Sequence, residues 1–250
     1  MVIHELELND LRPRSLDRWL SISHEGVWPS LERIGVSVVG AWLVALGRSP
    51  QTVVLYEYPD HGAIAQRCGL FAPENQSPAF VERAELLEHS TSELLIPSPH
   101  WPVSLGQRSG IFTIRRFHVN PASIGRFQKM TGELIWPKGR EHGYGDYVGL
   151  WTTALSARPR IVMMTRYDSF GLWDETHPAH GASISDGDLV EWRAALAERD
   201  LETLSSEVIV LRSLPVPAIR SEGDSAVQLS SSPLKTARAS SNRDETPVRE

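Results

Sequence analysis

The sequence has a single cysteine, Cys68, among its 250 residues. One cysteine excludes an intramolecular disulfide and any zinc site that needs several cysteine ligands. Positive charge is also scarce, because 25 Lys and Arg residues stand against 31 Asp and Glu residues, a formal net charge of −6. With no Lys/Arg cluster in the chain, this balance argues against a nucleic-acid partner.

Long apolar runs are absent as well. No stretch approaches the roughly 20 consecutive apolar residues that a membrane span needs, so we expect no membrane partner. The first strand is expected within the first few residues and contains Glu5 and Glu7, which does not fit a signal peptide. We therefore expect a cytoplasmic protein.

Familiar catalytic and cofactor motifs are also missing. There is no Ser-His-Asp elbow and no phosphate-binding P-loop, and Gly143-Tyr144-Gly145 lacks the strand-then-helix context of a dinucleotide site. The nine histidines include no pair at a spacing typical of metal ligands, such as His-x-x-x-His on a helix. We expect no metal and no cofactor.

What the sequence does contain is one pattern written twice, about a hundred residues apart. Apolar residues with helical and strand periods surround the repeated markers and predict a β-α-β-β-α-β order in each copy. Pro29 lies inside the first predicted helix and should bend it. The paired markers are Val27-Trp28-Pro29 with Ile135-Trp136-Pro137, Gly40-x-Trp42 with Gly149-x-Trp151, and Tyr58 with Tyr167.

The predicted elements divide the chain into four parts. Residues 1–97 form the first repeat, 98–110 a linker rich in Pro, Ser and Gly, 111–215 the second repeat, and 216–250 a disordered tail in which the apolar pattern stops. The strands are expected at 2–8, 36–46, 52–58, 93–96, 111–119, 147–155, 161–167 and 207–212. The helices are expected at 16–34, 63–87, 123–142 and 186–204.

The predicted fold class is α+β. A single β-α-β-β-α-β unit has helices on only one face of its sheet, so the other face must be covered. We expect two tandem ferredoxin-like units to pack sheet to sheet, as an intrachain dimeric α/β barrel with the helices outside. Since both halves are on one chain, the fold is compatible with a homodimer but does not require one.

Three segments resemble the NIPSNAP family, within the dimeric α/β-barrel superfamily: Arg115-x-Phe117 before a Pro-containing turn, Gly149-x-Trp151, and Arg166-Tyr167-Asp168-Ser169. The resemblance covers roughly residues 3–212 and is stronger in the second copy. It implies the barrel fold. It says less about function, since eukaryotic members look like mitochondrial adaptor proteins and some relatives in the superfamily bind haem.

The copies differ at two positions of interest. Glu7 stands where the second copy has Arg115, and Glu57 stands where it has Arg166. By the two-residue period of a strand, Glu5 and Glu7 share one face, and Arg115 lies on the matching face of the second copy. The opposite faces are apolar and suit packing under helices, so we expect Glu5, Glu7 and Arg115 to point into the barrel.

Two interpretations of these charged residues stay open. They form ion pairs across the interface between the copies and fix how the two halves meet. Alternatively they line a polar pocket, in which Glu5 or Glu7 acts as a general base and Arg115 holds an acidic or enolic substrate. Glu57 and Arg166 would then take part in substrate binding.

Trp42 and Trp151 also have two interpretations. Large aromatic side chains commonly dominate cores and interfaces, so packing is the simpler one. The other is that both indoles line a pocket for a flat aromatic ligand. We therefore expect a protein that binds a small aromatic or enolisable molecule between its two sheets. Whether it is a cofactor-independent isomerase, cyclase, lyase or monooxygenase, or a non-catalytic scaffold, stays open.

Overall fold

The computed structural model describes residues 1–46, 50–72, 77–105, 109–156, 158–175 and 188–216. Among these residues, no helix is long and apolar enough to cross a membrane. The strands are β1 (Ile3–Leu11), β2 (Ser37–Val44), β3 (Gln51–Tyr58), β4 (Leu87–Pro97), β5 (Ile111–Val119), β6 (Asp146–Thr153), β7 (Arg160–Tyr167) and β8 (Thr203–Ser213). The α-helices are α1 (Leu16–Ile22), α2 (Trp28–Glu32), α3 (His61–Leu70), α4 (Pro78–Glu85), α5 (Ile124–Met130), α6 (Trp136–Glu141), α7 (Phe170–Glu175) and α8 (Asp188–Leu201).

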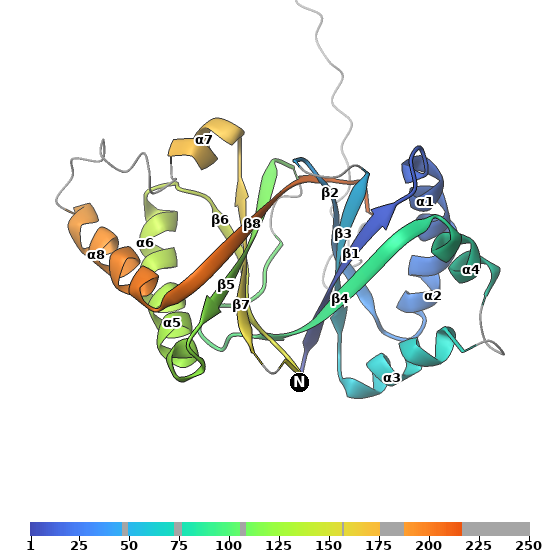
Figure 1. The fold of residues 1–250 in the computed structure, drawn as a ribbon, viewed down its shortest axis with the longest axis horizontal. Helices are drawn as coiled ribbons and strands as arrows, with labels where there is room; N and C mark the ends of the chain where they lie inside the picture. The colour runs from blue at the N-terminus through green and yellow to red at the C-terminus, as the bar shows by residue number, and fades with distance from the viewer. Residues whose placement is uncertain (47–49, 73–76, 106–108, 157, 176–187, 217–250) are drawn as a thin grey trace, which may run out of the picture. The chain divides into compact units, whose positions relative to one another are not determined.

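The eight strands form a closed antiparallel barrel in the order β1-β3-β2-β8-β5-β7-β6-β4, with the helices outside it (Figure 1). The first half (residues 1–97) contributes the neighbours β2-β3-β1-β4, and the second half (residues 111–215) contributes β6-β7-β5-β8. Short ladders close the barrel where β2 meets β8 and where β4 meets β6. The expected α+β barrel is confirmed.

The two halves pair their strands in the same register. The ladders between first and third strands begin at Ile3↔Tyr58 and at Ile111↔Tyr167. Glu7 and Arg115 therefore occupy equivalent positions, as do Glu57 and Arg166. The differences between the halves are thus differences between side chains on equivalent backbone positions.

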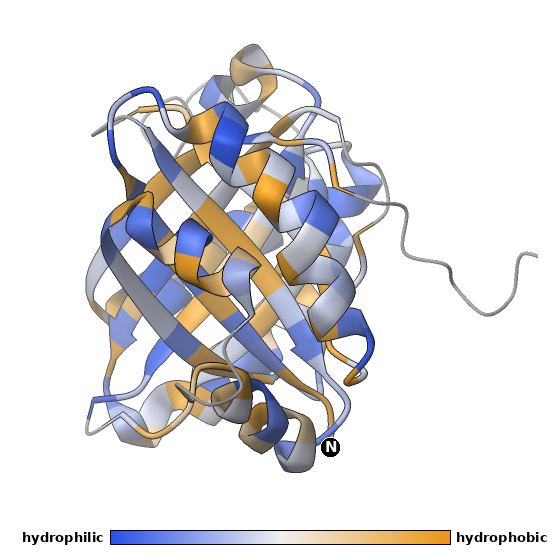
Figure 2. Ribbon diagram, turned by 90° about the vertical axis from the view of Figure 1, so that its right-hand side faces the viewer, coloured by the Kyte–Doolittle hydropathy of each residue, from blue (hydrophilic) through white to orange (hydrophobic). Residues whose placement is uncertain are grey.

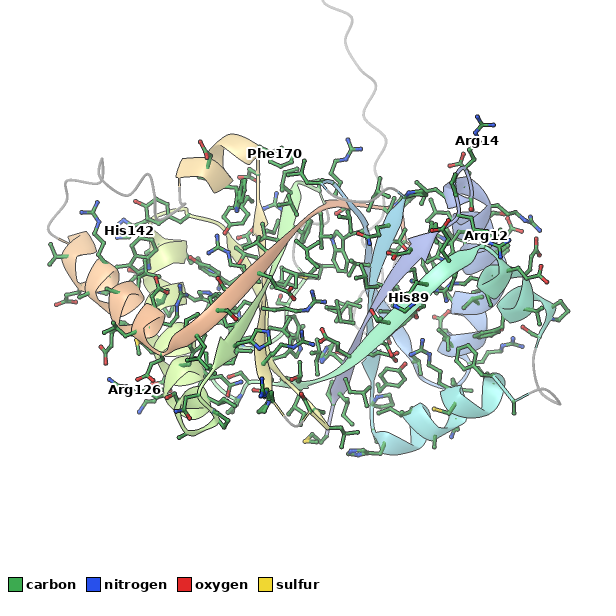
Figure 3. All side chains as sticks on the ribbon, viewed as in Figure 1. Arg12, Arg14, His89, Arg126, His142 and Phe170 are labelled. Atoms are coloured by element: carbon green, nitrogen blue, oxygen red, sulfur yellow. The ribbon has the colours of Figure 1, made fainter. Side chains whose placement is uncertain are left out.

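Apart from β4 and β8, the strands of the barrel are buried on both faces along most of their length. Inward-facing side chains from the two halves pack into one core, to which Leu6, Leu55, Phe112 and Ile114 belong. Two further cores lie under the helices, one in each half. Hydrophobic and hydrophilic residues alternate along the strands (Figure 2), and side chains occupy the space that the strands enclose (Figure 3). The barrel interior is therefore a packed core.

The repeated Gly-x-Trp motif is a packing unit of this core. A Cβ atom added to Gly40 would lie 2.4 Å from the ring of Trp42, and one added to Gly149 would lie 2.2 Å from the ring of Trp151. Each indole covers the glycine two residues before it on the same face of the strand. Both indoles are 1 % exposed, so neither ring has room to move aside.

The repeated Trp-Pro motif marks a widened helical turn. The helix continues from α1 into α2 through a π-helical turn, η1 (Ser23–Val27), directly before Trp28-Pro29. The second half repeats this with η3 (Thr131–Ile135), between α5 and α6. Because proline has no N–H and its ring clashes with the preceding turn, the regular α-helical pattern is interrupted there, as the sequence predicts.

The last strand of each half is longer than expected. The sequence predicts 93–96 and 207–212, whereas β4 and β8 have 11 residues each. Their additional residues are mostly polar and exposed, so they lack the apolar pattern of a strand. They are strands because their backbone pairs with β1 and β5. Short α7 was not predicted. Residues 217–250, nearly all of the expected disordered tail, lie outside the described residues.

We expect Gly149→Ala to lower the free energy of unfolding by about 1–3 kcal/mol, because the new methyl group overpacks the core against Trp151. The matched control is Gly125→Ala on α5, an exposed position with no atom within 4 Å of an added Cβ. There, alanine should be neutral or stabilising. Chemical denaturation of both variants measures this. Equal stability of the two would contradict the packing role of the motif.

Candidate functional site

Glu5 and Glu7 point away from the barrel interior. Their side chains bond to arginines of α3 and α4, while Leu6 between them belongs to the inward core. The same holds on β5, where Phe112 and Ile114 are inward and Arg115 is on the helix side. The predicted orientation was wrong, because the inward core is the apolar one and the carboxylates find their partners under the helices.

The described residues therefore do not favour a ligand site between the two sheets. Trp42 and Trp151 do face inward, but they fill that space, which agrees with the packing interpretation. Glu5 and Glu7 line a pocket of the first half, whereas Arg115 lines a separate pocket of the second half. The structure thus separates the predicted general bases from the predicted substrate-holding arginine.

Glu57 and Arg166 lie near the ends of β3 and β7, and each has its own partners. Glu57 Oε2 is 3.3 Å from His4 Nε2, and hydrogen bonding to His4 lowers the pKa of Glu57. Arg166 donates to the carboxylates of Asp146 and Asp168 at 2.6 and 2.5 Å. These contacts hold the strand ends, and a role of either residue in substrate binding stays a prediction.

The main candidate site is a pocket of about 440 Å³ in the first half. It lies between the outward face of β1, β3 and β4 and the helices α3 and α4. Glu5, Glu7, Arg67 and Arg83 form its polar side. The apolar side consists of Ile64, Phe71, Phe80, Leu87 and Leu94.

A buried network joins the charged groups of this pocket. Arg67 forms an ion pair with Glu5 and donates from Nη2 to Glu7 Oε2 at 2.9 Å. Arg83 donates from Nη2 to the other oxygen of Glu7 at 2.5 Å. Tyr58 receives a hydrogen bond from Arg67 at 2.5 Å and donates its own proton to Glu5 Oε2. All four charged side chains are 10 % exposed or less.

Burial shapes the protonation of this network. It lowers the pKa of Arg67 to about 10, and the nearby charge of Arg83 acts in the same direction. Burial also disfavours the charged form of Arg83, but Glu7 and Tyr56 outweigh it and raise the pKa of Arg83. Burial raises the pKa of Tyr58, so its hydroxyl stays protonated and donates. At neutral pH, Arg67 and Arg83 are therefore both charged and the Tyr58 phenol is neutral.

One oxygen of Glu5 is free to meet a ligand. Oε2 is occupied by Tyr58 and Arg67, whereas Oε1 has no partner among the described residues. A carboxylate oxygen that is held in place but unsatisfied suits a hydroxyl or an acidic C–H of a bound molecule.

The sequence interpretation missed Arg67 and Arg83, which complete this site. Arg67 lies four residues after Ala63 on the buried side of α3, and Arg83 is buried on α4. Each guanidinium also packs over an aromatic ring, Arg67 at 4.7 Å from Tyr56 and Arg83 at 4.9 Å from Trp19. The signal in the sequence was an arginine at a helix position whose period places it on the buried side, in a half whose first strand has two glutamates.

Ion pairs between the halves exist, but not among the predicted residues. Glu93 of β4 accepts a hydrogen bond from Arg116 Nε of β5 at 2.9 Å and also pairs with Arg160 of β7. These side chains are between 10 and 30 % exposed. Such pairs favour one register of the two halves more reliably than they add stability.

The site contains no evident metal centre. Across the described ranges, no group of three or more His, Cys, Asp or Glu side chains is arranged to hold a metal ion. The charged side chains of the pocket are instead paired with one another.

Comparison with solved structures shows that the fold is that of dimeric α/β-barrel proteins. A candidate monooxygenase from Lactobacillus acidophilus is 12 % identical, with a TM-score of 0.58, covering 84 % of this chain and 92 % of its own. A candidate monooxygenase from Fusobacterium nucleatum is 12 % identical, with a TM-score of 0.56 and coverage of 86 % and 93 %. An anthrone oxidase-like protein is 11 % identical, with a TM-score of 0.51 and coverage of 86 % and 92 %. At these identities the likeness establishes a shared fold.

Residues 4–102 match the NIPSNAP family model, which confirms the resemblance to this family. The match falls on the first half, whereas the motifs predict the stronger resemblance in the second. The matched region includes Glu5, Glu7, Arg67 and Arg83, so all the residues that line the candidate pocket lie within it. Comparison with curated protein sequences finds no match.

We expect Glu7→Gln to lower the free energy of unfolding by about 3–5 kcal/mol, because it leaves Arg83 buried without its carboxylate. Glu82→Gln is the matched control, since Glu82 pairs with Arg18 at the surface, where both side chains are more than 40 % exposed. That change should cost less than about 1 kcal/mol. Urea denaturation of both variants measures the difference. A small effect of Glu7→Gln would mean that the network does not support the fold.

Proposed function

We propose that the protein binds a small aromatic or enolisable molecule in the pocket between the first-half sheet and helices α3 and α4. The observation that carries this proposal is the free Oε1 of Glu5 on the wall of a pocket of about 440 Å³. Small-molecule sites are typically apolar cavities of this order with a few placed polar groups. The apolar side would hold the ring of the ligand. Glu5 would accept a hydrogen bond from its hydroxyl or take up its acidic proton.

We also propose that the chain is a tandem of two ferredoxin-like NIPSNAP repeats, 1–97 and 111–215. The shared register of the two halves and the repeated π-helical turn support this interpretation. In this interpretation, the pocket that contains Glu5 and the pocket that contains Arg115 occupy equivalent places in the two repeats. The first has a volume of about 440 Å³ and the second about 60 Å³, so of these two the first can hold a ligand with a ring.

A catalytic role is the second candidate, and the pocket favours it in one respect. It brings together a carboxylate and arginines, the combination expected for a general base with a cation that holds an enolate. Arg67 and Arg83 would hold the substrate, the role that the sequence predicts for Arg115. A cofactor-independent isomerase, cyclase, lyase or monooxygenase would begin by taking a proton from an enolisable substrate, and Glu5 would take that proton. A non-catalytic scaffold would bind without it.

Binding can be tested with 2-naphthol, a flat aromatic probe with one acidic hydroxyl, by following its fluorescence. We expect saturable binding at one site, and weaker binding of naphthalene, which has no hydroxyl for Glu5. Ser92→Trp fills the pocket from β4 without removing a charge, and should weaken binding at least tenfold, about 1.4 kcal/mol.

The matched control is Val208→Trp, the equivalent position on β8, because Ser92 pairs with Glu7 as Val208 pairs with Arg115. Both positions are exposed. This variant should bind 2-naphthol like the unchanged protein. Equal binding by the protein and its Ser92→Trp variant would contradict the proposed site.

Catalysis can be tested with 2-tetralone, an enolisable aromatic ketone. We expect the protein to accelerate exchange of the α-protons with deuterated solvent by about 100-fold, as a general base does. Glu5→Gln should abolish the acceleration and keep measurable binding. Proton NMR follows the exchange. If the protein binds the ketone without accelerating exchange, the non-catalytic alternative stands and the enzyme hypothesis fails.

A further inference from the structure

The second half has a smaller pocket of about 60 Å³ in the equivalent place, between its sheet and α8. Arg115 of β5 and Arg199 of α8 both line it, together with the tyrosines Tyr144, Tyr147 and Tyr167. Within the part of the chain that the structure describes, no Asp or Glu lines this pocket. Two guanidinium groups therefore share a small space without a facing carboxylate.

Arg199 is the counterpart of Arg83. Each lies four residues before the start of the last strand of its half. Arg83 packs over the ring of Trp19 on α1, and Arg199 packs over the ring of Phe127 at the equivalent position on α5. In the first half, Arg83 meets Glu7. In the second half the residue equivalent to Glu7 is Arg115, so the ion pair is replaced by two like charges.

The charge of Arg199 is poorly compensated. The residue is 5 % exposed. Among the described residues, its Nε has no hydrogen-bond partner, and its one ion pair runs from Nη2 to the exposed Asp200 at 3.2 Å. Burial lowers the pKa of Arg199, and the charge of Arg115 contributes in the same direction. For Arg115, no hydrogen bond or ion pair occurs with any described residue. Burying charge in this way is costly unless an opposite charge joins it.

We propose that the second-half pocket binds a small oxyanion, a carboxylate or a phosphate, between Arg115 and Arg199. Guanidinium groups bind both of these anions through paired hydrogen bonds. Burial raises the pKa of Tyr147, so its hydroxyl stays protonated and is a further donor. The volume admits a small anion and excludes the ring system proposed for the first half, so this site is independent of the proposed function.

The test is the melting temperature of the full chain at constant ionic strength in sodium phosphate, sodium acetate or sodium chloride. When the concentration of phosphate or acetate is ten times its dissociation constant, we expect that anion to raise Tm by about 4 °C relative to chloride. The anion with the larger effect identifies the ligand class. If both behave like chloride, the proposal is overturned.

Two variants test the residues. Arg115→Glu restores the charge arrangement of the first half, so Tm in chloride should rise and the response to phosphate and acetate should disappear. Arg115→Met removes the repulsion without adding a carboxylate and should also lose the response. Ser92→Trp, in the other half, should keep it. An undiminished response in both Arg115 variants would overturn the assignment.

Discussion

The first strands of the two halves, β1 and β5, are buried on both faces. The inward faces of the strands meet in one apolar core that the two halves share. This core leaves no room for the carboxylates of Glu5 and Glu7 on β1. Charged residues on the outward face can be accommodated only where a helix offers an opposite charge. Arg67 and Arg83 offer it to Glu5 and Glu7, and this pairing places the candidate pocket under the helices.

The same constraint explains how the two halves differ. Both have an arginine on the last helix, Arg83 or Arg199, stacked on an aromatic ring. On the first strand, Glu5 and Glu7 of one half correspond to Thr113 and Arg115 of the other, so one half has a pocket of paired charges and the other a cationic pocket. The pockets also differ in volume, about 440 against 60 Å³, so the halves offer different chemistry on a common backbone.

Much of the fold could be predicted from the sequence, because Gly-x-Trp and Trp-Pro report on local packing and helix geometry. The orientation of Glu5 and Glu7 could not, since alternation along a strand reveals its face only when one face meets water. The arginine partners of Glu7 are 60 and 76 residues away, so only the tertiary structure brings them together. The polar parts of β4 and β8 were missed for a related reason, because backbone pairing rather than side-chain burial makes them strands.

The seam between β2 and β8 has a consequence for how the chain folds. It consists of three residue pairs, Trp42 to Val44 against Leu211 to Ser213. During synthesis, the edge of β2 and the apolar face around Trp42 stay uncovered until nearly all of the barrel sequence has left the ribosome. An open edge beside an apolar face is prone to pair with other chains. Chaperone dependence and intermolecular misassembly should therefore concentrate in the interval before β8 emerges.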